Sequence, residues 1–264
     1  MPMPKALAPA KPTSHKTTSA AASGQPAQPP PWLSALTALK RYDSGTDRAV
    51  LLPLDEAVRA ATADATLRRE LETQLVKTLA EGLSRVAGEY VCDKLAMIGS
   101  DRCVPALAAL LGDLVLNTPA RTALEAIPGR AAGRALSDAL ARLDGLPRLG
   151  VIHSLGMRRE TSSVRLLAAL LRQGDVPTRN AAAAALGEIG SVRAARVLRE
   201  AVAAVLPAVE PALCNALLTC AERLAAEGNM AEAHRLGQLV QQTATAAHIR
   251  AAAGRLSGRG PNPN

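Results

Sequence analysis

The sequence predicts an all-α protein, a right-handed α-solenoid built from about five helical-hairpin repeats. The first observation is composition. The 264-residue chain is 48% hydrophobic but has no Phe, one Trp and two Tyr, so Ala, Leu, Val and Ile must fill the core, and alanine has the highest helix propensity. The second observation is that no alternating strand pattern or hairpin signal occurs. The third is an internal repeat, which determines the architecture when it is present.

The repeat is marked by two apolar residues three positions apart, followed by glycine or Pro-Gly. It occurs four times, as Leu95/Ile98 before Gly99, Leu124/Ile127 before Pro128-Gly129, Ile152/Leu155 before Gly156, and Leu186/Ile189 before Gly190. Glycine is common just past a helix C-terminus, where the backbone turns left-handed. Each motif is therefore predicted to end the first helix of a unit at a glycine turn.

A second helix follows each turn in a regular register. Its apolar residues lie nine and thirteen positions after the motif in three units, at Leu107/Leu111, Leu136/Leu140 and Leu198/Val202. In the third unit they fall three positions later, at Leu167 and Leu171, and we attribute the shift to the insertion Arg158-Arg159-Glu160. The shared register predicts tandem helical hairpins, each of which buries its apolar face against its neighbours.

The segments around the repeats complete the predicted organisation. Residues 1–31 are rich in Pro, Ser, Thr and Lys, and such a segment buries too little apolar surface to offset the entropy of ordering. We therefore predict a disordered tail over 1–31, the solenoid over 32–257 and a flexible C-terminal tail over 258–264. Helical spacing also predicts helices that begin at Trp32, a fifth pair over 211–242 and a final helix over 248–256.

The stretch from Arg179 to Val202, RNAAAAALGEIGSVRAARVLREAV, resembles a HEAT repeat of the short bacterial kind named after the phycobilisome lyases. Residues 42–171 further resemble large bacterial HEAT-repeat proteins. The resemblance implies an α-solenoid that serves as a scaffold, with the second helices lining the concave side of the superhelix. It implies little about activity.

Charge and cysteine usage indicate a cytoplasmic protein. The formal net charge is +8, and half of it comes from Lys5, Lys11, Lys16 and Lys40, an excess that permits a polyanionic partner without requiring one. No apolar run is long enough to span a membrane, and the N-terminus lacks the hydrophobic centre of a secretory signal. Because the four cysteines form no CxxC pair, we expect small buried core residues in a reducing compartment.

No motif for catalysis or metal binding is found, so we predict no cofactor, no metal and no enzymatic activity. HEAT proteins that bind two irons, such as the deoxyhypusine hydroxylases, use His-Glu dipeptides, and none of the four histidines here precedes Glu. His153 is expected in the core or in a groove. A bilin lyase remains a lesser alternative, since the aromatic residues Trp32, Tyr42 and Tyr90 lie outside the central repeats.

Arginines on the predicted second helices are the candidate functional residues, because they project opposite the leucine stripes. They are Arg134, Arg142, Arg165, Arg172, Arg193, Arg196 and Arg199. A groove lined by them would suit bidentate capture of carboxylates or phosphates. The alternative is an ordinary solvated surface, since Asp138 and Glu200 lie among them. We expect a protein partner with an acidic segment. Nucleic acid bound through its backbone is the second possibility, less favoured because stacking aromatics are missing.

Overall fold

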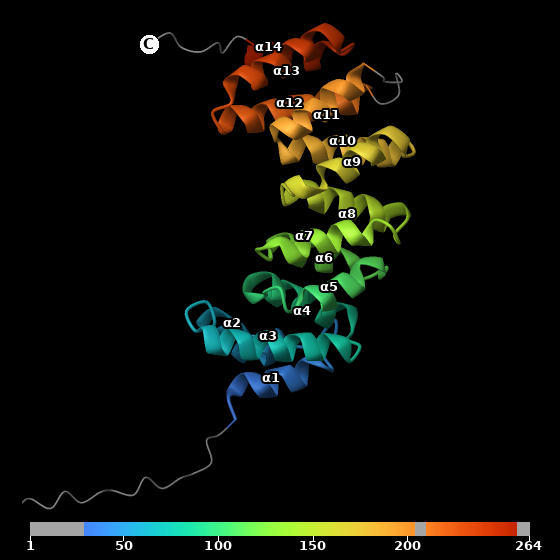
Figure 1. Ribbon diagram of the computed structural model, residues 1–264. Coiled ribbons are helices and arrows are strands. Elements are labelled where there is room, and N and C mark those ends of the chain that lie inside the picture. The colour runs from blue at the N-terminus through green and yellow to red at the C-terminus, as the bar shows by residue number, and fades with distance from the viewer. Residues whose placement is uncertain (1–28, 204–209, 258–264) are drawn as a thin grey trace, which may run out of the picture. The chain divides into compact units, whose positions relative to one another are not determined.

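A computed structural model describes residues 29–203 and 210–257 of the chain. Residues 1–28 of the predicted N-terminal tail and the whole predicted C-terminal tail lie outside this part. The described residues contain helices and turns and no strand, and those from Pro31 onward form one compact unit. The stacked helices confirm the predicted all-α solenoid (Figure 1). No helix in the described residues is both long and apolar enough to span a membrane.

The chain forms fourteen α-helices in its described part. In order they are α1 (Pro31–Leu39), α2 (Leu52–Ala60), α3 (Ala65–Ala80), α4 (Arg85–Ile98), α5 (Val104–Ala109), α6 (Asn117–Ala126), α7 (Arg130–Ala139), α8 (Gly145–Met157), α9 (Val164–Gln173), α10 (Val176–Ile189), α11 (Val192–Val202), α12 (Glu210–Ala226), α13 (Met230–Thr243) and α14 (Ala247–Ser257). Short 3₁₀ turns precede α2 (η1, Arg48–Leu51), follow α5 (η2, Leu110–Gly112) and precede α9 (η3, Thr161–Ser163).

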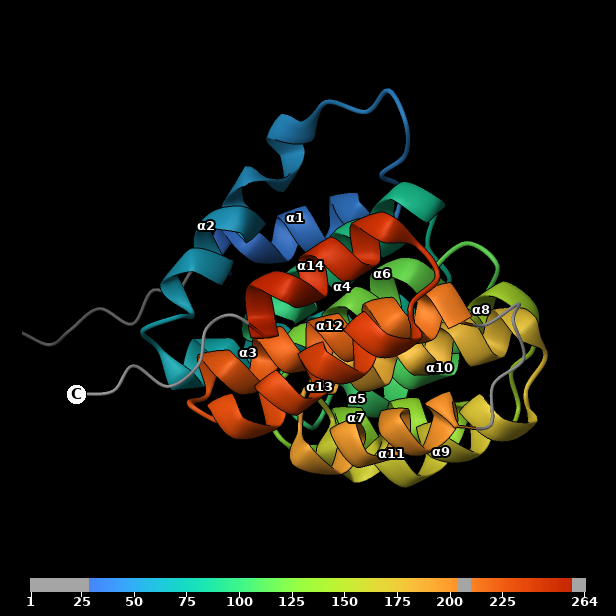
Figure 2. The same ribbon diagram turned by 90° about the horizontal axis from the view of Figure 1, so that it is seen from above.

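The helices from α4 to α13 pair into the five predicted hairpins, which stack in two layers. The first helices α4, α6, α8, α10 and α12 contact one another in sequence, and α14 packs against α12 and α13. The second helices α5, α7, α9, α11 and α13 form the other layer, in which α9 contacts α11 and α5 contacts α7. Viewed along the stack, α7, α9 and α11 lie together on the side away from α4 and α6 (Figure 2).

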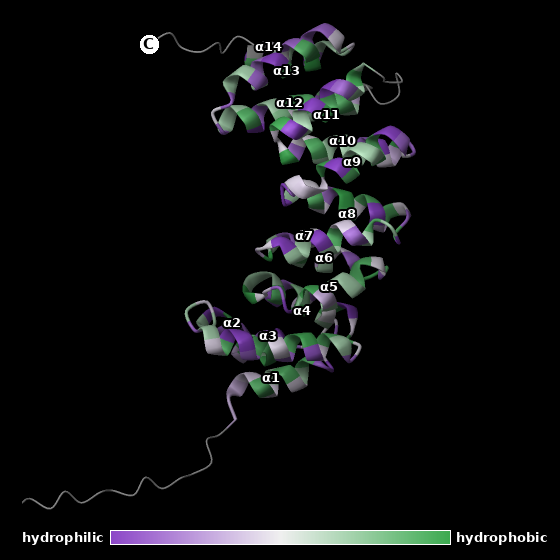
Figure 3. Cartoon of the chain, viewed as in Figure 1, coloured by the Kyte–Doolittle hydropathy of each residue, from purple (hydrophilic) through white to green (hydrophobic). Residues whose placement is uncertain are grey.

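The predicted anchor residues form the core between these layers. Leu136 of α7, Leu167 of α9 and Leu198 of α11 are all fully buried. The same helices expose polar residues on the opposite side, so that hydrophilic and hydrophobic positions alternate within single helices (Figure 3). This amphipathic pattern is the reason that each hairpin requires a neighbour.

The glycines after the four motifs have different roles, which partly corrects the prediction. Gly129 (φ +90°) and Gly190 (φ +61°) adopt the predicted positive φ. Gly99 ends α4 in an extended conformation, and α8 continues past Gly156 to Met157. A Cβ at Gly156 would lie 2.8 Å from the Ala185 backbone of α10. Gly156 therefore permits close helix packing and does not form the turn.

The insertion Arg158-Arg159-Glu160 makes that turn and joins three repeats. Arg158 donates hydrogen bonds to the carbonyls of Leu124, Ile127 and Gly129 at the end of α6. Arg159, at φ +51°, donates to the Ile189 carbonyl at the end of α10 and pairs with Glu227. The carbonyls at a helix C-terminus have no partner within the helix, so the two arginines, from the turn after α8, supply donors to the ends of α6 and α10.

Candidate functional site

The seven candidate arginines lie on the second helices or, for Arg142, just after one. Arg134 is on α7 and Arg142 follows that helix. Arg165 and Arg172 are on α9, and Arg193, Arg196 and Arg199 are on α11. All seven side chains are exposed. The only acids on these three helices are Asp138 and Glu200. We call this set of seven residues the arginine face.

Three of the arginines occupy the same position in successive repeats. Arg134, Arg165 and Arg196 each precede a buried anchor leucine by two residues and are 31 residues apart. Equivalent positions on stacked helices present their side chains on the same face of the solenoid. This correspondence is a sequence signal, but it becomes visible only when the arginines are counted from the leucines and not from the glycine motifs.

Three members of the arginine face have partners. Arg142 donates a hydrogen bond to the Ala108 carbonyl (3.1 Å), Arg196 lies 3.8 Å from Glu200, and Arg199 lies 3.4 Å from Glu232 of α13. The side chains of Arg196 and Glu200 are both more than half exposed, and an exposed ion pair of this length contributes little stability. Only Arg199 contacts a buried carboxylate.

Four members have no ion pair within the part of the chain that the structure describes. They are Arg134, Arg165, Arg172 and Arg193. Asp138 is four residues after Arg134 and yet outside ion-pair distance of it. The acids among the arginines therefore compensate Arg196 and leave the other charges open, so the arginine face has a net positive charge.

Register and contact together place three of the four open arginines, Arg165, Arg172 and Arg193, around the junction of α9 and α11. Arg199 pairs with α13, so that side of α11 faces the next repeat, and Arg196 lies one turn before it. Arg165 is the equivalent of Arg196 and therefore lies on the side of α9 that faces α11, a helix that α9 contacts. Arg193 lies in the first turn of α11, about 120° around the helix from Arg199 and about 140° from the buried Leu198 at about 100° per residue, which turns it toward α9.

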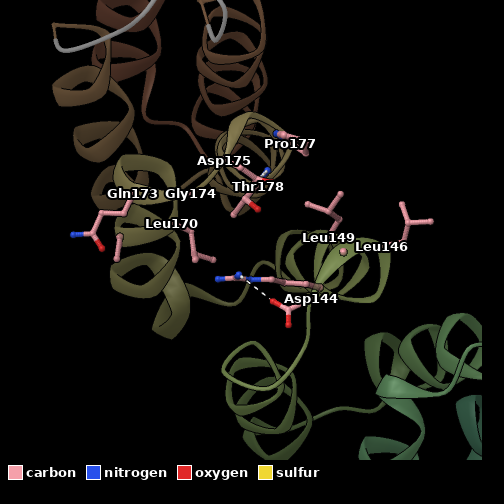
Figure 4. A pocket seen from close by; sticks show the side chains of 12 residues that line it. Asp144, Leu146, Leu149, Leu170, Gln173, Gly174, Asp175, Pro177 and Thr178 are labelled. Carbon is pink, nitrogen blue, oxygen red and sulfur yellow. Dashed lines mark hydrogen bonds and ion pairs between the residues drawn. The ribbon is translucent and has the colours of Figure 1, made fainter.

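A pocket of about 630 Å³ lies at a different place, where the N-terminal ends of α8 and α10 meet the end of α9 (Figure 4). Asp144 and Asp175 line it together with Leu149 and Leu170. The Arg148 guanidinium enters from α8, 3.9 Å from the Asp144 carboxylate. Hydrogen bonds from Thr178 hold the pKa of Asp175 below its usual range. The pocket therefore mixes two acids with one base and has no charge of a single sign.

A second pocket, of about 570 Å³, opens between α4 and the start of α6, beside the exposed Leu114 and Val115. Its charged residues are Arg85, Glu89 and Asp93, and Arg85 already pairs with Glu89 at 2.7 Å. None of the seven candidate arginines lines either pocket. Neither pocket therefore adds a group to the arginine face.

The cysteines and His153 do not form a reactive site. All four cysteines are buried as predicted, and burial raises the pKa of Cys92, Cys103 and Cys220 to about 12. His153, expected in the core or in a groove, is exposed on α8 and so is not a core residue: it falls on the outward side of the helix, between the buried Ile152 and Ser154. No group of three potential metal ligands occurs within the described residues.

The comparison with family models matches residues 133–217, from within α7 to within α12, to a model described as HEAT repeats. The chain contains HEAT repeats. The match covers the stretch that carries all seven residues of the arginine face. A search of curated proteins finds no match. Among solved structures, the chain is similar to human deoxyhypusine hydroxylase in complex with glycerol, at 17% identity and a TM-score of 0.41, over 71% of this chain and 97% of that one.

This last comparison corrects the prediction that the chain is not an enzyme. The similar structure is an enzyme that is itself built from helical repeats, and we therefore withdraw the exclusion of catalysis. The likeness assigns no activity to this chain, because its identity and TM-score are too low to transfer one.

Proposed function

We propose that the HEAT repeats act as a scaffold whose arginine face binds an acidic segment of a protein partner. The observation that carries this proposal is the set of four arginines that make no ion pair within the described residues, on three helices of the second layer whose two acids do not compensate them. Guanidinium groups bind carboxylates through two parallel hydrogen bonds. Exposed arginines left open on one face are thus available for a partner.

The first-layer arginines support the same proposal by contrast. Arg121 of α6 donates to the Gly150 carbonyl and to Ser154 of α8, and Arg223 of α12 pairs with Glu188 of α10 at 2.6 Å. The fold thus uses arginine for stabilisation where a helix neighbour offers an acceptor. The four open arginines have no such role.

The experiment is a binding titration of the full chain with a labelled glutamate-rich peptide, followed by fluorescence anisotropy. The triple variant Arg165→Glu, Arg172→Glu and Arg193→Glu should lose binding. A matched control changes three exposed arginines elsewhere, Arg59, Arg69 and Arg102, to Glu, which alters the net charge equally. Equal loss in both variants would mean that only net charge matters and would remove the assignment of this face.

Nucleic acid is the alternative partner, because a positive face also attracts a phosphate backbone. In that case a labelled duplex should bind more tightly than the peptide, and its affinity should fall steeply with salt. We favour the protein segment because Trp32 and Tyr90 are buried far from α9 and α11 in the chain, so bases would find no stacking partner there. A cytoplasmic location is proposed from composition and the buried thiols, and cell fractionation tests it.

A further inference from the structure

We propose that the α9 and α11 arginines recognise a phosphoryl group on the partner segment, held between Arg165 and Arg193, with a carboxylate of the same segment at Arg172. This inference rests on the proposed function and specifies the chemistry of the partner. Three observations support it. The arginines without an ion pair in the described residues lie on two helices that contact each other, their charge matches that of a phosphoryl group, and their spacing matches that of an extended peptide.

The open charge is concentrated at one helix junction. Glu200 and Glu232 compensate Arg196 and Arg199, and α9 contains no acid at all. Arg165, Arg172 and Arg193 therefore remain without an ion pair in the described residues, on helices that contact each other. Arg134 is also open, but α7 is separated from α9 by the insertion, whose Glu160 side chain packs on Gly133.

The charge of the Arg165–Arg193 pair fits a phosphate monoester. A phosphorylated serine or threonine carries about −1.5 to −2 at neutral pH, which two guanidinium groups balance. A single carboxylate or a phosphodiester carries one negative charge and would leave one of the two guanidinium charges unbalanced. Each guanidinium also offers a fork of donors to the phosphoryl oxygens.

The spacing allows both arginines to reach one group. Packed helices have axes about 8–10 Å apart, and Arg193 lies about 4.5 Å along α11 from Arg196, the equivalent of Arg165, at the helical rise per residue. Arg165 and Arg193 thus approach the junction from opposite sides with a small axial offset. Long arginine side chains can converge across such a distance.

Arg172 adds a second contact along the same line. It follows Arg165 by seven residues on α9, which corresponds to about 10.5 Å of helix. Three residues of an extended chain cover about 10 Å. A segment lying along the junction with its phosphoryl group at Arg165 and Arg193 would therefore place an acidic residue three positions away at Arg172.

The test measures binding of four labelled peptides to the full chain at one salt concentration. One carries phosphoserine with Glu three residues later. In the second and third peptides the phosphoserine is replaced by Ser and by Glu. The fourth peptide keeps the phosphoserine, but its Glu is moved to the adjacent position. We expect the first peptide to bind about tenfold tighter than the Glu version, since phosphoserine carries about −1.5 to −2 charge and three acceptor oxygens where Glu carries a single charge, and tighter than the version with the moved Glu.

Variants connect this preference to named residues. Arg165→Gln and Arg193→Gln should each remove the preference for phosphoserine over Glu, whereas Arg172→Gln should remove the dependence on the position of the second acid. Arg165→Lys should restore only part of the preference, because lysine lacks the fork. Arg69→Gln and Arg102→Gln are controls with the same charge change and should leave all four affinities unchanged.

The outcomes separate this inference from the proposed function. If the phosphoserine and Glu peptides bind equally but through Arg165 and Arg193, the acidic partner stands and the phosphoryl group is wrong. If no peptide binds in an arginine-dependent way, both fail. Displacement of the peptide by inorganic phosphate at comparable concentration would indicate a site for free phosphate. Tighter, arginine-dependent binding of a DNA duplex would indicate nucleic acid. Either result overturns the inference.

Discussion

The two helix layers of this solenoid use arginine in opposite ways. In the first layer and its turns, Arg121, Arg158 and Arg223 reach the neighbouring repeat and donate to carbonyls or carboxylates there. In the second layer, Arg165, Arg172 and Arg193 have no such partner within the described residues. Composition alone would not distinguish these six residues. What differs is whether an acceptor of the next repeat lies within reach.

Close packing explains the difference. First helices approach so closely that a Cβ at Gly187 of α10 would lie 2.7 Å from the Ala216 carbonyl oxygen of α12. Long side chains there reach the adjacent backbone. Second helices bury leucine on one side, and of the seven arginines on the other side only Arg142 and Arg199 reach a group of a neighbouring repeat within the described residues. The first layer therefore provides stability, and the second leaves charge available for a partner. Four predictions test this division, from the largest expected effect to the smallest.

Gly187→Leu should have the largest effect. The added side chain must displace the backbone of α12, and overpacking of this kind costs about 3 kcal/mol in the free energy of unfolding. Ala184→Leu adds a side chain on the exposed side of the same helix and should change stability by less than about 0.5 kcal/mol. Urea unfolding followed by circular dichroism measures both. Similar midpoints for the two variants would contradict close packing in the first layer.

Arg158→Met should cost about 1.5–3 kcal/mol, because it removes a charged donor from the carbonyls of Leu124, Ile127 and Gly129. Arg130→Met is the control, since Arg130 is exposed at the start of α7 and its side chain makes no hydrogen bond or ion pair within the described residues. The same urea titration compares them. A loss no greater than that of the control would show that water replaces Arg158 at the end of α6.

The contacts of Asp55 predict a pH-dependent contribution to the free energy of unfolding. Burial acts to raise its pKa, but hydrogen bonds from Lys94 (2.8 Å) and Tyr90 (2.9 Å) outweigh burial and hold the pKa below its ordinary value of 3.8. The unfolded chain then binds the proton more readily, so the contribution is present above about pH 4 and is lost as the pH falls through the lowered pKa.

Asp55→Asn should accordingly lower the stability at neutral pH and flatten its decline in acid. The measurement is the free energy of unfolding as a function of pH for this variant, the parent chain and the exposed control Asp93→Asn. Parallel curves for Asp55→Asn and the parent would show that the contact with Lys94 and Tyr90 does not couple protonation to folding.

Arg165→Ala and Arg193→Ala should have the smallest effect on stability, within about 0.5 kcal/mol, because neither side chain makes an ion pair that folding would lose. Thermal unfolding of the full chain checks this. A cost similar to that of Arg158→Met would mean that these arginines stabilise the fold, and the contrast between the layers would disappear.

The sequence was sufficient to predict the repeats because they follow from the helical register of nearby leucines. Leucines in helical register can be buried only against similar hairpins, so Leu136, Leu167 and Leu198 indicated the second helices correctly and are fully buried. The exposed positions of the arginines followed from the same periodicity. The glycine motifs were less reliable, because glycine serves both turns and close contacts: Gly190 makes a turn, whereas Gly156 accommodates Ala185.

Tertiary structure alone decided which charges are compensated. Asp138 and Glu200 occupy equivalent positions, four residues after Arg134 and Arg196, yet only Glu200 forms an ion pair. Glu232 lies 33 residues after Arg199 in the chain and meets it because α13 stacks on α11. Helical periodicity determines the side of a helix on which a residue lies. Whether an acceptor lies within a few ångströms depends on the packing between repeats, and that distance is what separates a stabilising arginine from one left open for a partner.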